Sequence, residues 1–141
     1  MMTRPSGSDT WQRDDRAVVY QHEGRARYPG VCRTARGRMF ILFTRQTEEQ
    51  EKEETGDLVL VPRSPDGKWW IRPRVVFSGD GVPRAAGTMT TLADGRIIAP
   101  FVRELCEFEL CSADAESSLR VLESRDDGDT WTVGTPVEQQ H

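Results

Sequence analysis

The stretch Ser124-Arg125-Asp126-Asp127-Gly128-Asp129-Thr130-Trp131 decides how this chain is interpreted. It follows a strand-like run and fits the pattern SxDxGxTW at each fixed position. In tight turns, Ser and Asp side chains bond nearby backbone amides and Gly takes the positive-φ position. The stretch therefore predicts a hairpin between two strands, with Trp131 covering the turn. Asp126 and Asp127 are accordingly interpreted as turn residues and not as a catalytic pair.

A degenerate copy of this motif, one residue shorter, occurs earlier as Ser64-Pro65-Asp66-Gly67-Lys68-Trp69-Trp70. Its Asp66-Gly67 pair is a good two-residue hairpin signal. The strand-like segments before each motif also recur: Gly37–Phe43 matches Gly95–Phe101, and Asp57–Ser64 matches Ser117–Ser124. Self-similarity of this kind indicates a tandem structural repeat.

Each copy contains four strand-like segments bounded by Gly, Pro and Asp turns, at 29–35, 38–45, 57–64 and 69–77 in the first and 86–92, 96–103, 118–124 and 130–137 in the second. No segment keeps an apolar period of 3.6 residues, so almost no helix is expected. Four-stranded antiparallel units in tandem are the blades of a propeller. The predicted fold is all-β, a partial β-propeller with a flexible leader at 1–16, a first blade at 17–81 and a second blade at 82–141.

The motif at 124–131 resembles the Asp-box of sialidases (neuraminidases) and related BNR-repeat propellers. The resemblance implies a six-bladed fold with Asp-boxes at its periphery, and an exo-α-sialidase activity, that is, a glycoside hydrolase acting on a sialoside-like glycan. Sialidases use a tyrosine nucleophile where most glycosidases use a carboxylate. In the family a glutamate activates the tyrosine, an aspartate acts as acid/base, and three arginines clamp the substrate carboxylate.

The same resemblance suggests substrate-binding residues. Arg27-Tyr28-Pro29 is similar to the Arg-Ile-Pro motif that carries the first arginine, although Ala26 replaces the usual aromatic and Arg25 competes for the role. Arg45 is in a position similar to that of the second-strand arginine. Arginine suits a carboxylate because its planar fork pairs bidentately. Thr88 is a further candidate; the alternatives are a surface arginine at Arg27 and an ordinary strand threonine at Thr88.

The acid/base aspartate of the family has no evident counterpart. By spacing before the strand that follows, Glu53 or Glu54 lies nearest, whereas Asp57 begins the strand itself. A glutamate performs general acid/base chemistry when its pKa is tuned by burial. The acidic stretch 48–57 is, however, most simply a solvated loop. Glu53, Glu54 and Asp57 are therefore alternative catalytic candidates.

The tyrosine nucleophile also lacks a candidate, because Tyr20 and Tyr28 both belong to the N-terminal region. We therefore expect a fragment of a propeller that is inactive alone, with exposed blade faces that favour self-association. The alternative is a non-catalytic Asp-box propeller module that binds carbohydrate or protein, since a fold does not fix a function.

Composition argues against several other classes. The net charge of −4 disfavours a nucleic-acid partner, which prefers a concentrated basic face. The apolar runs are far shorter than the about 20 residues of a membrane span, and no secretory signal is visible near the N-terminus. The cysteines Cys32, Cys106 and Cys111 fit neither a zinc module nor a disulfide framework. No metal, cofactor or membrane partner is expected, and the compartment is not indicated.

Overall fold

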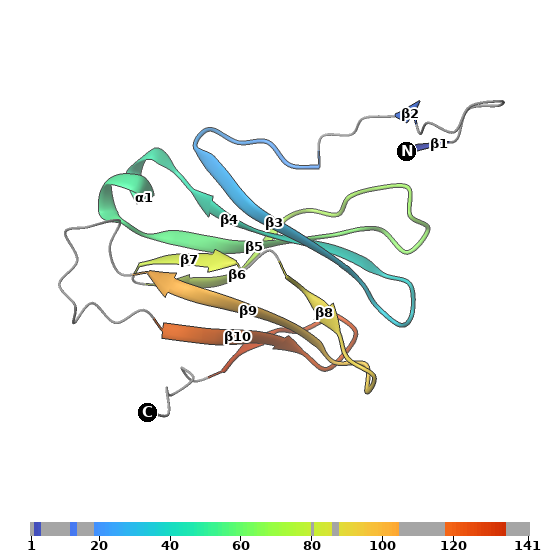
Figure 1. Cartoon of the computed structure of the whole chain (residues 1–141). Coiled ribbons are helices and arrows are strands. Elements are labelled where there is room, and N and C mark those ends of the chain that lie inside the picture. The colour runs from blue at the N-terminus through green and yellow to red at the C-terminus, as the bar shows by residue number, and fades with distance from the viewer. Residues whose placement is uncertain are drawn as a thin grey trace.

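Two antiparallel sheets pack as two layers, and a separate two-stranded sheet pairs β1 with β2 (Figure 1). The computed structural model describes residues 2–3, 12–13, 19–79, 81–85, 88–104 and 118–134. Its elements are β1 (Met2–Thr3), β2 (Gln12–Arg13), β3 (Arg25–Arg33), β4 (Met39–Gln46), α1 (Glu48–Glu53), β5 (Gly56–Pro62), β6 (Arg74–Gly79), β7 (Val82–Ala85), β8 (Thr90–Thr91), β9 (Ile97–Glu104), β10 (Ser118–Ser124) and β11 (Thr132–Val133). The predicted all-β class is confirmed, while closure into a propeller ring stays a prediction.

The first sheet has the order β3-β4-β5-β6, so each strand pairs with the next one along the chain. The pairing of β3 with β4 shifts between Arg27 and Gly30, where Tyr28 has a left-handed φ of 56°. Such a bulge bends the strand and re-aims its side chains. The fourth strand begins at Arg74, later than predicted, and Pro73 directly before it has no N–H to give to a ladder.

The second sheet has the order β11-β10-β9-β7, and β8 also pairs with β9. β7 and β8 thus act as one interrupted strand along the same edge, and the second sheet repeats the four-strand order of the first. Of the strand predicted at 86–92, Thr90–Thr91 form β8, and β7 lies before the predicted range. Residues 86–87, and residues 135–137 of the last predicted strand, lie outside the described part of the chain.

The strand register corrects the repeat alignment by one residue. Ile41 pairs with Val61 in the first sheet, and Ala99 pairs with Leu122 in the second. The Gly37 and Gly95 turns equate Ile41 with Ala99, so Val61 corresponds to Leu122 and not to residue 121. In the first, shorter turn Arg63 forms an isolated bridge with Trp70.

Apolar side chains from both sheets fill the space between the layers. The core contains Cys32, Phe40, Leu42, Leu58, Leu60, Met89, Ile97, Ala99, Phe101 and Leu122. Removing this apolar surface from water is the main force that holds the sheets together. Thr44 adds a polar tie, because its buried hydroxyl donates to the carbonyl of Pro83 at 2.6 Å.

The acidic stretch forms a short helix, α1, and not the expected loop. Thr47 caps it: its Oγ1 accepts from the Gln50 amide at 3.1 Å, and Gln50 Oε1 accepts from the Thr47 amide at 2.9 Å. The helix ends at Glu54, which has a left-handed φ of 56°. None of its residues is buried, so it left no apolar period in the sequence. Among the described helices, none is long and apolar enough to span a membrane.

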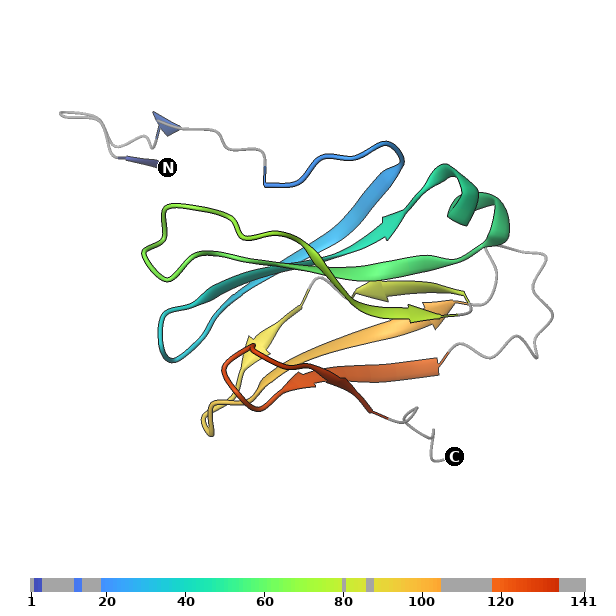
Figure 2. The same ribbon diagram turned by 180° about the vertical axis from the view of Figure 1, so that it is seen from behind.

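The two ends of the layered structure differ. Figures 1 and 2 show α1 and the start of β3 at one end, and the turn joining β10 to β11 at the other. That turn contains Ser124–Trp131, as predicted, and Ser124 Oγ accepts from the Gly128 amide at 2.8 Å. Asp126 Oδ1 accepts from the Thr130 amide at 2.8 Å. The motif therefore lies away from the predicted site residues of β3 and β4.

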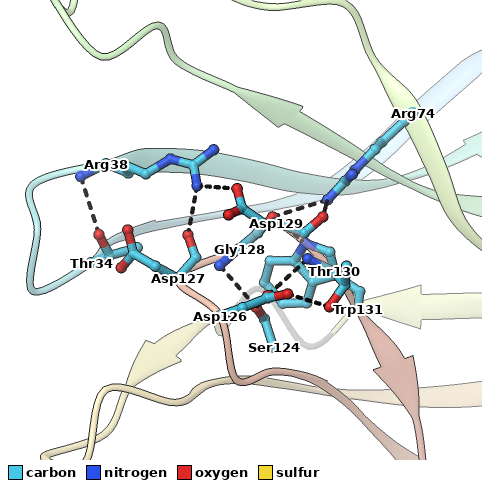
Figure 3. A network of polar contacts seen from close by, with 10 residues as sticks. All are labelled: Thr34, Arg38, Arg74, Ser124, Asp126, Asp127, Gly128, Asp129, Thr130 and Trp131. Atoms are coloured by element: carbon cyan, nitrogen blue, oxygen red, sulfur yellow. Dashed lines mark hydrogen bonds and ion pairs between the residues drawn. The ribbon is translucent and has the colours of Figure 1, made fainter.

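The Ser124–Trp131 turn also joins the two sheets (Figure 3). Arg38 Nη1 donates to the carbonyl of Asp127 at 2.9 Å and to Asp129 Oδ1 at 2.7 Å. Arg74 Nη2 donates to the carbonyls of Gly128 and Asp129, at 2.9 and 3.0 Å. Two arginines of the first sheet thus hold the backbone of a turn that belongs to the second.

Candidate functional site

Polar side chains form a row across the first sheet, near the end that carries α1. Arg45 pairs in register with Ala26 and Asp57, and Asp57 pairs with Ser78. Arg45 Nη2 donates to Asp57 Oδ2 at 2.7 Å, and the Ser78 hydroxyl donates to Asp57 Oδ1. Arg45 Nη1 also donates to the Tyr20 hydroxyl at 3.3 Å. Antiparallel pairing brings Arg45, Asp57 and Ser78 together, because directly opposite side chains share a face, and Tyr20 joins them from the segment before β3.

The Arg45–Asp57 pair is charged at neutral pH. Burial alone would raise the pKa of Asp57, but hydrogen bonds from Ser78 and Arg45 outweigh it and hold that pKa below the ordinary 3.8. Burial would lower the pKa of Arg45, and hydrogen bonds with Tyr20 and Asp57 raise it instead. An ionised Asp57 suits the role of a fixed acceptor, whereas a general acid works best with a pKa near the operating pH.

Helix α1 presents a second carboxylate to the arginines of β3. Arg25 Nε forms an ion pair with Glu51 Oε1, and Arg27 Nη2 lies 4.0 Å from the same oxygen. A polar hollow of about 450 Å³ opens beside them, lined by Arg25, Gln46, Glu48, Glu51 and Lys52. Arg25 and Arg27 thus lie against Glu51, whereas Arg45, whose register partner is Ala26, pairs with Asp57 on the opposite face of the sheet.

An apolar groove lies beside this polar region. It has a volume of about 170 Å³ and is lined by Val19, Tyr20, Ala26, Arg27, Pro29, Ile41 and Phe43. The Tyr20 ring packs on Phe43 with centroids 4.8 Å apart, while its hydroxyl reaches Arg45. Arg27 borders the groove and extends its guanidinium toward Glu51, so apolar and charged parts of one side chain meet different surroundings.

Of the predicted site residues, the structure brings Arg45 and Asp57 into direct contact. Arg27, Arg45 and Asp57 lie at the same end of the first sheet, on β3, β4 and β5. Glu53 and Glu54 lie at the end of α1 and are exposed. Thr88 is exposed on the second sheet, between β7 and β8. The catalytic and substrate-binding roles of all six stay predictions.

Sequence reasoning missed three residues of this site. Glu51 was hidden within an acidic run, and its proximity to Arg25 depends on the helix. Tyr20 was set aside as N-terminal, although its hydroxyl contacts Arg45. Ser78 gave no signal, because its contact with Asp57 comes from strand pairing between distant segments.

The described residues give little support for metal binding or thiol chemistry. Within them, no group of three or more His, Cys, Asp or Glu side chains is arranged to hold a metal ion. Cys32 is buried, and burial raises the pKa of its thiol to about 11. Cys106 and Cys111 lie outside the described residues.

Comparisons with known proteins show the fold. No family model and no curated protein matches the sequence. A protein of unknown function from Dyadobacter fermentans DSM 18053 matches in structure with a TM-score of 0.66 and 22% identity, over 88% of this chain and 39% of that one. An endo-arabinase from Bacteroides thetaiotaomicron VPI-5482 matches with a TM-score of 0.59 and 14% identity, over 92% of this chain and 49% of that one. The chain thus spans less than half the length of each.

These identities establish similarity of fold alone. The similarity is to a glycoside hydrolase, the endo-arabinase, and it does not single out the sialidases. The two four-stranded sheets fit the shape of partial propeller blades.

Proposed function

We propose that this chain forms part of the glycan-binding site of a sialidase-type glycoside hydrolase, and that its arginines bind the carboxylate of an anionic sugar. The observation that carries the proposal is the pair Arg25 and Arg27, which both lie against Glu51 of α1 beside an open polar hollow. Guanidinium groups bind carboxylates with strong, charge-assisted and often bidentate hydrogen bonds. The open polar hollow beside them offers room for a sugar ring.

Arg27 is the arginine best placed to exchange partners. Its ion pair with Glu51 spans 4.0 Å, whereas Arg45 is held by Asp57 at 2.7 Å. A ligand carboxylate that binds Arg27 therefore replaces a longer ion pair than one that binds Arg45. Arg45 is the better support, because its pairing with Asp57 and Tyr20 fixes one side of the site.

The role proposed for the chain is to bind the glycan more than to cleave its glycosidic bond. Glu53 and Glu54 are the proposed alternatives for acid/base function, because they lie at the end of α1, whose residues Glu48 and Glu51 line the polar hollow. Asp57, whose pKa is lowered, is proposed to position Arg45. Thr88 is retained as a proposed sugar contact from the second sheet.

Titration of the chain with sialyllactose and with lactose, followed by NMR, tests the sugar class. Arg27→Ala is expected to weaken sialyllactose binding at least about tenfold, as loss of a charge-assisted pair does. Arg36→Ala is the matched control, because Arg36 is exposed in the turn between β3 and β4, at the far end of the sheet. Equal affinity for both sugars, or equal effects of both variants, would refute the proposal.

A non-catalytic binding module is the second candidate. The ionised state of Asp57 favours it, because the buried carboxylate of the site is committed to Arg45 and Ser78 and not to proton transfer. A fluorogenic sialoside assay separates the two functions: turnover that Glu53→Gln or Glu54→Gln abolishes supports the hydrolase. Sialyllactose binding without turnover supports the module, and binding of arabino-oligosaccharides in its place would show that the sugar class is wrong.

A further inference from the structure

The carboxylate of Glu51 occupies the arginine pair that the proposed glycan would bind. Its Oε1 forms an ion pair with Arg25 Nε and lies 4.0 Å from Arg27 Nη2. That oxygen is buried, yet within the described residues it has no hydrogen bond of good geometry. Guanidinium groups bind carboxylates most strongly through paired, parallel hydrogen bonds. The arginine pair is therefore occupied by an internal carboxylate that does not use its full bonding capacity.

Helix α1, which carries Glu51, is held at its ends and not by a buried face. None of its residues is buried, whereas most helices in proteins are stabilised by packing of an apolar face. The reciprocal hydrogen bonds between Thr47 and Gln50 fix its first turn. Its C-terminal end depends on the left-handed backbone of Glu54, which is unfavourable for a residue with a Cβ. Segments with few buried contacts open locally at low cost in free energy.

The polar hollow of about 450 Å³ has one wall formed by the sheet and another formed by α1. Arg25 and Gln46 line it from β3 and β4, and Glu48, Glu51 and Lys52 line it from the helix. The Gln46 side chain donates to the carbonyl of Thr55 at 2.9 Å, so the chain that follows the helix is attached to β4. A shift of the helix away from the sheet would therefore widen the hollow without detaching β5.

We propose that Glu51 is an internal competitor of the ligand, and that α1 is the lid which moves when the carboxylate of the glycan displaces it. This proposal rests on the proposed function, because it concerns the occupant of the same arginine pair. Displacement exchanges one carboxylate for another on Arg25 and Arg27, and it returns the Glu51 carboxylate to water. The ligand then forms the hydrogen bonds that Glu51 lacks.

An internal competitor lowers the observed affinity for the ligand. The ligand binds only those molecules in which Glu51 has left the arginines, so the apparent dissociation constant is the intrinsic one divided by the open fraction. Removing the charge of Glu51 increases the open fraction and therefore the affinity. A sugar without a carboxylate gains nothing from this change, because it does not need the guanidinium groups.

Titration of wild type and Glu51→Gln with sialyllactose, lactose and acetate, followed by NMR of the arginine Nε–H signals, provides the test. Glu51→Gln is expected to bind both carboxylates about three- to fivefold more tightly than wild type, which is the value of a partly exposed ion pair. Lactose binding is expected to stay unchanged. Glu49→Gln is the matched control, because Glu49 lies on the same helix, is exposed and does not line the hollow.

A second variant, Thr47→Ala, tests the lid without a change in charge. It removes the hydroxyl that accepts from the Gln50 amide, and loss of such a cap destabilises a helix. Release of Glu51 becomes more frequent, so sialyllactose and acetate are expected to bind more tightly than in wild type. Unchanged affinity in folded Thr47→Ala would overturn the lid. Circular dichroism with thermal unfolding checks the folding of each variant.

The outcomes separate this proposal from the proposed function. If wild type binds sialyllactose and Glu51→Gln binds it no more tightly than Glu49→Gln, the internal competitor is refuted and the glycan site stands. If Glu51→Gln strengthens acetate binding while no variant binds sialyllactose, the glycan is wrong and the role of Glu51 on the arginine pair is supported. Failure of every variant to bind either carboxylate would overturn both proposals.

Discussion

Gly128 faces the ring of Phe40 with no room for a methyl group between them, because an added Cβ would overlap three ring atoms. The contact joins the turn of the second sheet to the core of the first. Gly128 also has a φ of +91°, which residues with a Cβ rarely adopt. One position thus combines a backbone requirement with a packing requirement.

Gly128→Ala is expected to lower the free energy of unfolding by about 2–4 kcal/mol, the sum of overpacking and left-handed strain. Gly37→Ala is the matched control: its φ is +82°, but nothing lies within 4 Å of an added Cβ. The control should cost about 1 kcal/mol, for backbone strain alone. Urea unfolding measures both, and equal losses would show that the Phe40 contact has no energetic role.

Arg45→Met is expected to cost about 2–3 kcal/mol at neutral pH, because it leaves the Asp57 carboxylate buried beside Ser78 without its counter-charge. The double variant Arg45→Met/Asp57→Leu should recover part of this loss, since no unpaired charge remains. Urea unfolding of the two variants and of wild type completes the comparison. A double variant less stable than Arg45→Met would contradict the expected coupling.

Stability should fall in acid partly through Asp126. Hydrogen bonds from the Thr130 hydroxyl and amide lower the pKa of Asp126 from 3.8 to about 2. A lowered pKa contributes stability that is present above the unfolded-state value and is lost as the pH falls through the folded-state value. The stability gap between wild type and Asp126→Asn should therefore narrow between about pH 4 and pH 2. Unfolding followed by tryptophan fluorescence at each pH measures the gap, and a constant gap would rule out this linkage.

Cys32 should react slowly while the chain is folded. Raising the pKa of its thiol from 9.0 to about 11 reduces the thiolate fraction at pH 8 roughly a hundredfold, and burial slows access further. Labelling with iodoacetamide, read by mass spectrometry of the Cys32 peptide, should be rapid only in denaturant. Equal rates in the folded and unfolded chain would show that the thiol is accessible.

Much of the fold was predictable because it depends on local patterns. The turn at Ser124–Trp131 uses side chains within a few residues of one another, so its sequence alone indicates its structure. The repeat then predicts the second unit from the first. The helix α1 was missed because it is stabilised by the Thr47–Gln50 cap and not by an apolar face.

The candidate site was less predictable because strand pairing assembles it. Arg45 and Asp57 are twelve positions apart, and Asp57 and Ser78 are twenty-one positions apart. No local pattern specifies that they face each other, since a one-residue slip in register would move one partner to the opposite face of the sheet. The same sensitivity explains why the repeat alignment needed correction at Val61 and Leu122.

Arg38 and Arg74 donate hydrogen bonds to the β10–β11 turn, mainly to its carbonyl oxygens. Every amino acid supplies a backbone carbonyl, so these hydrogen bonds depend on the backbone conformation of the turn more than on its side chains. After a duplication, such a junction tolerates substitutions in the loop as long as the bend survives. Repetitive β proteins of this kind thus tolerate surface substitutions without weakening the contacts between their units.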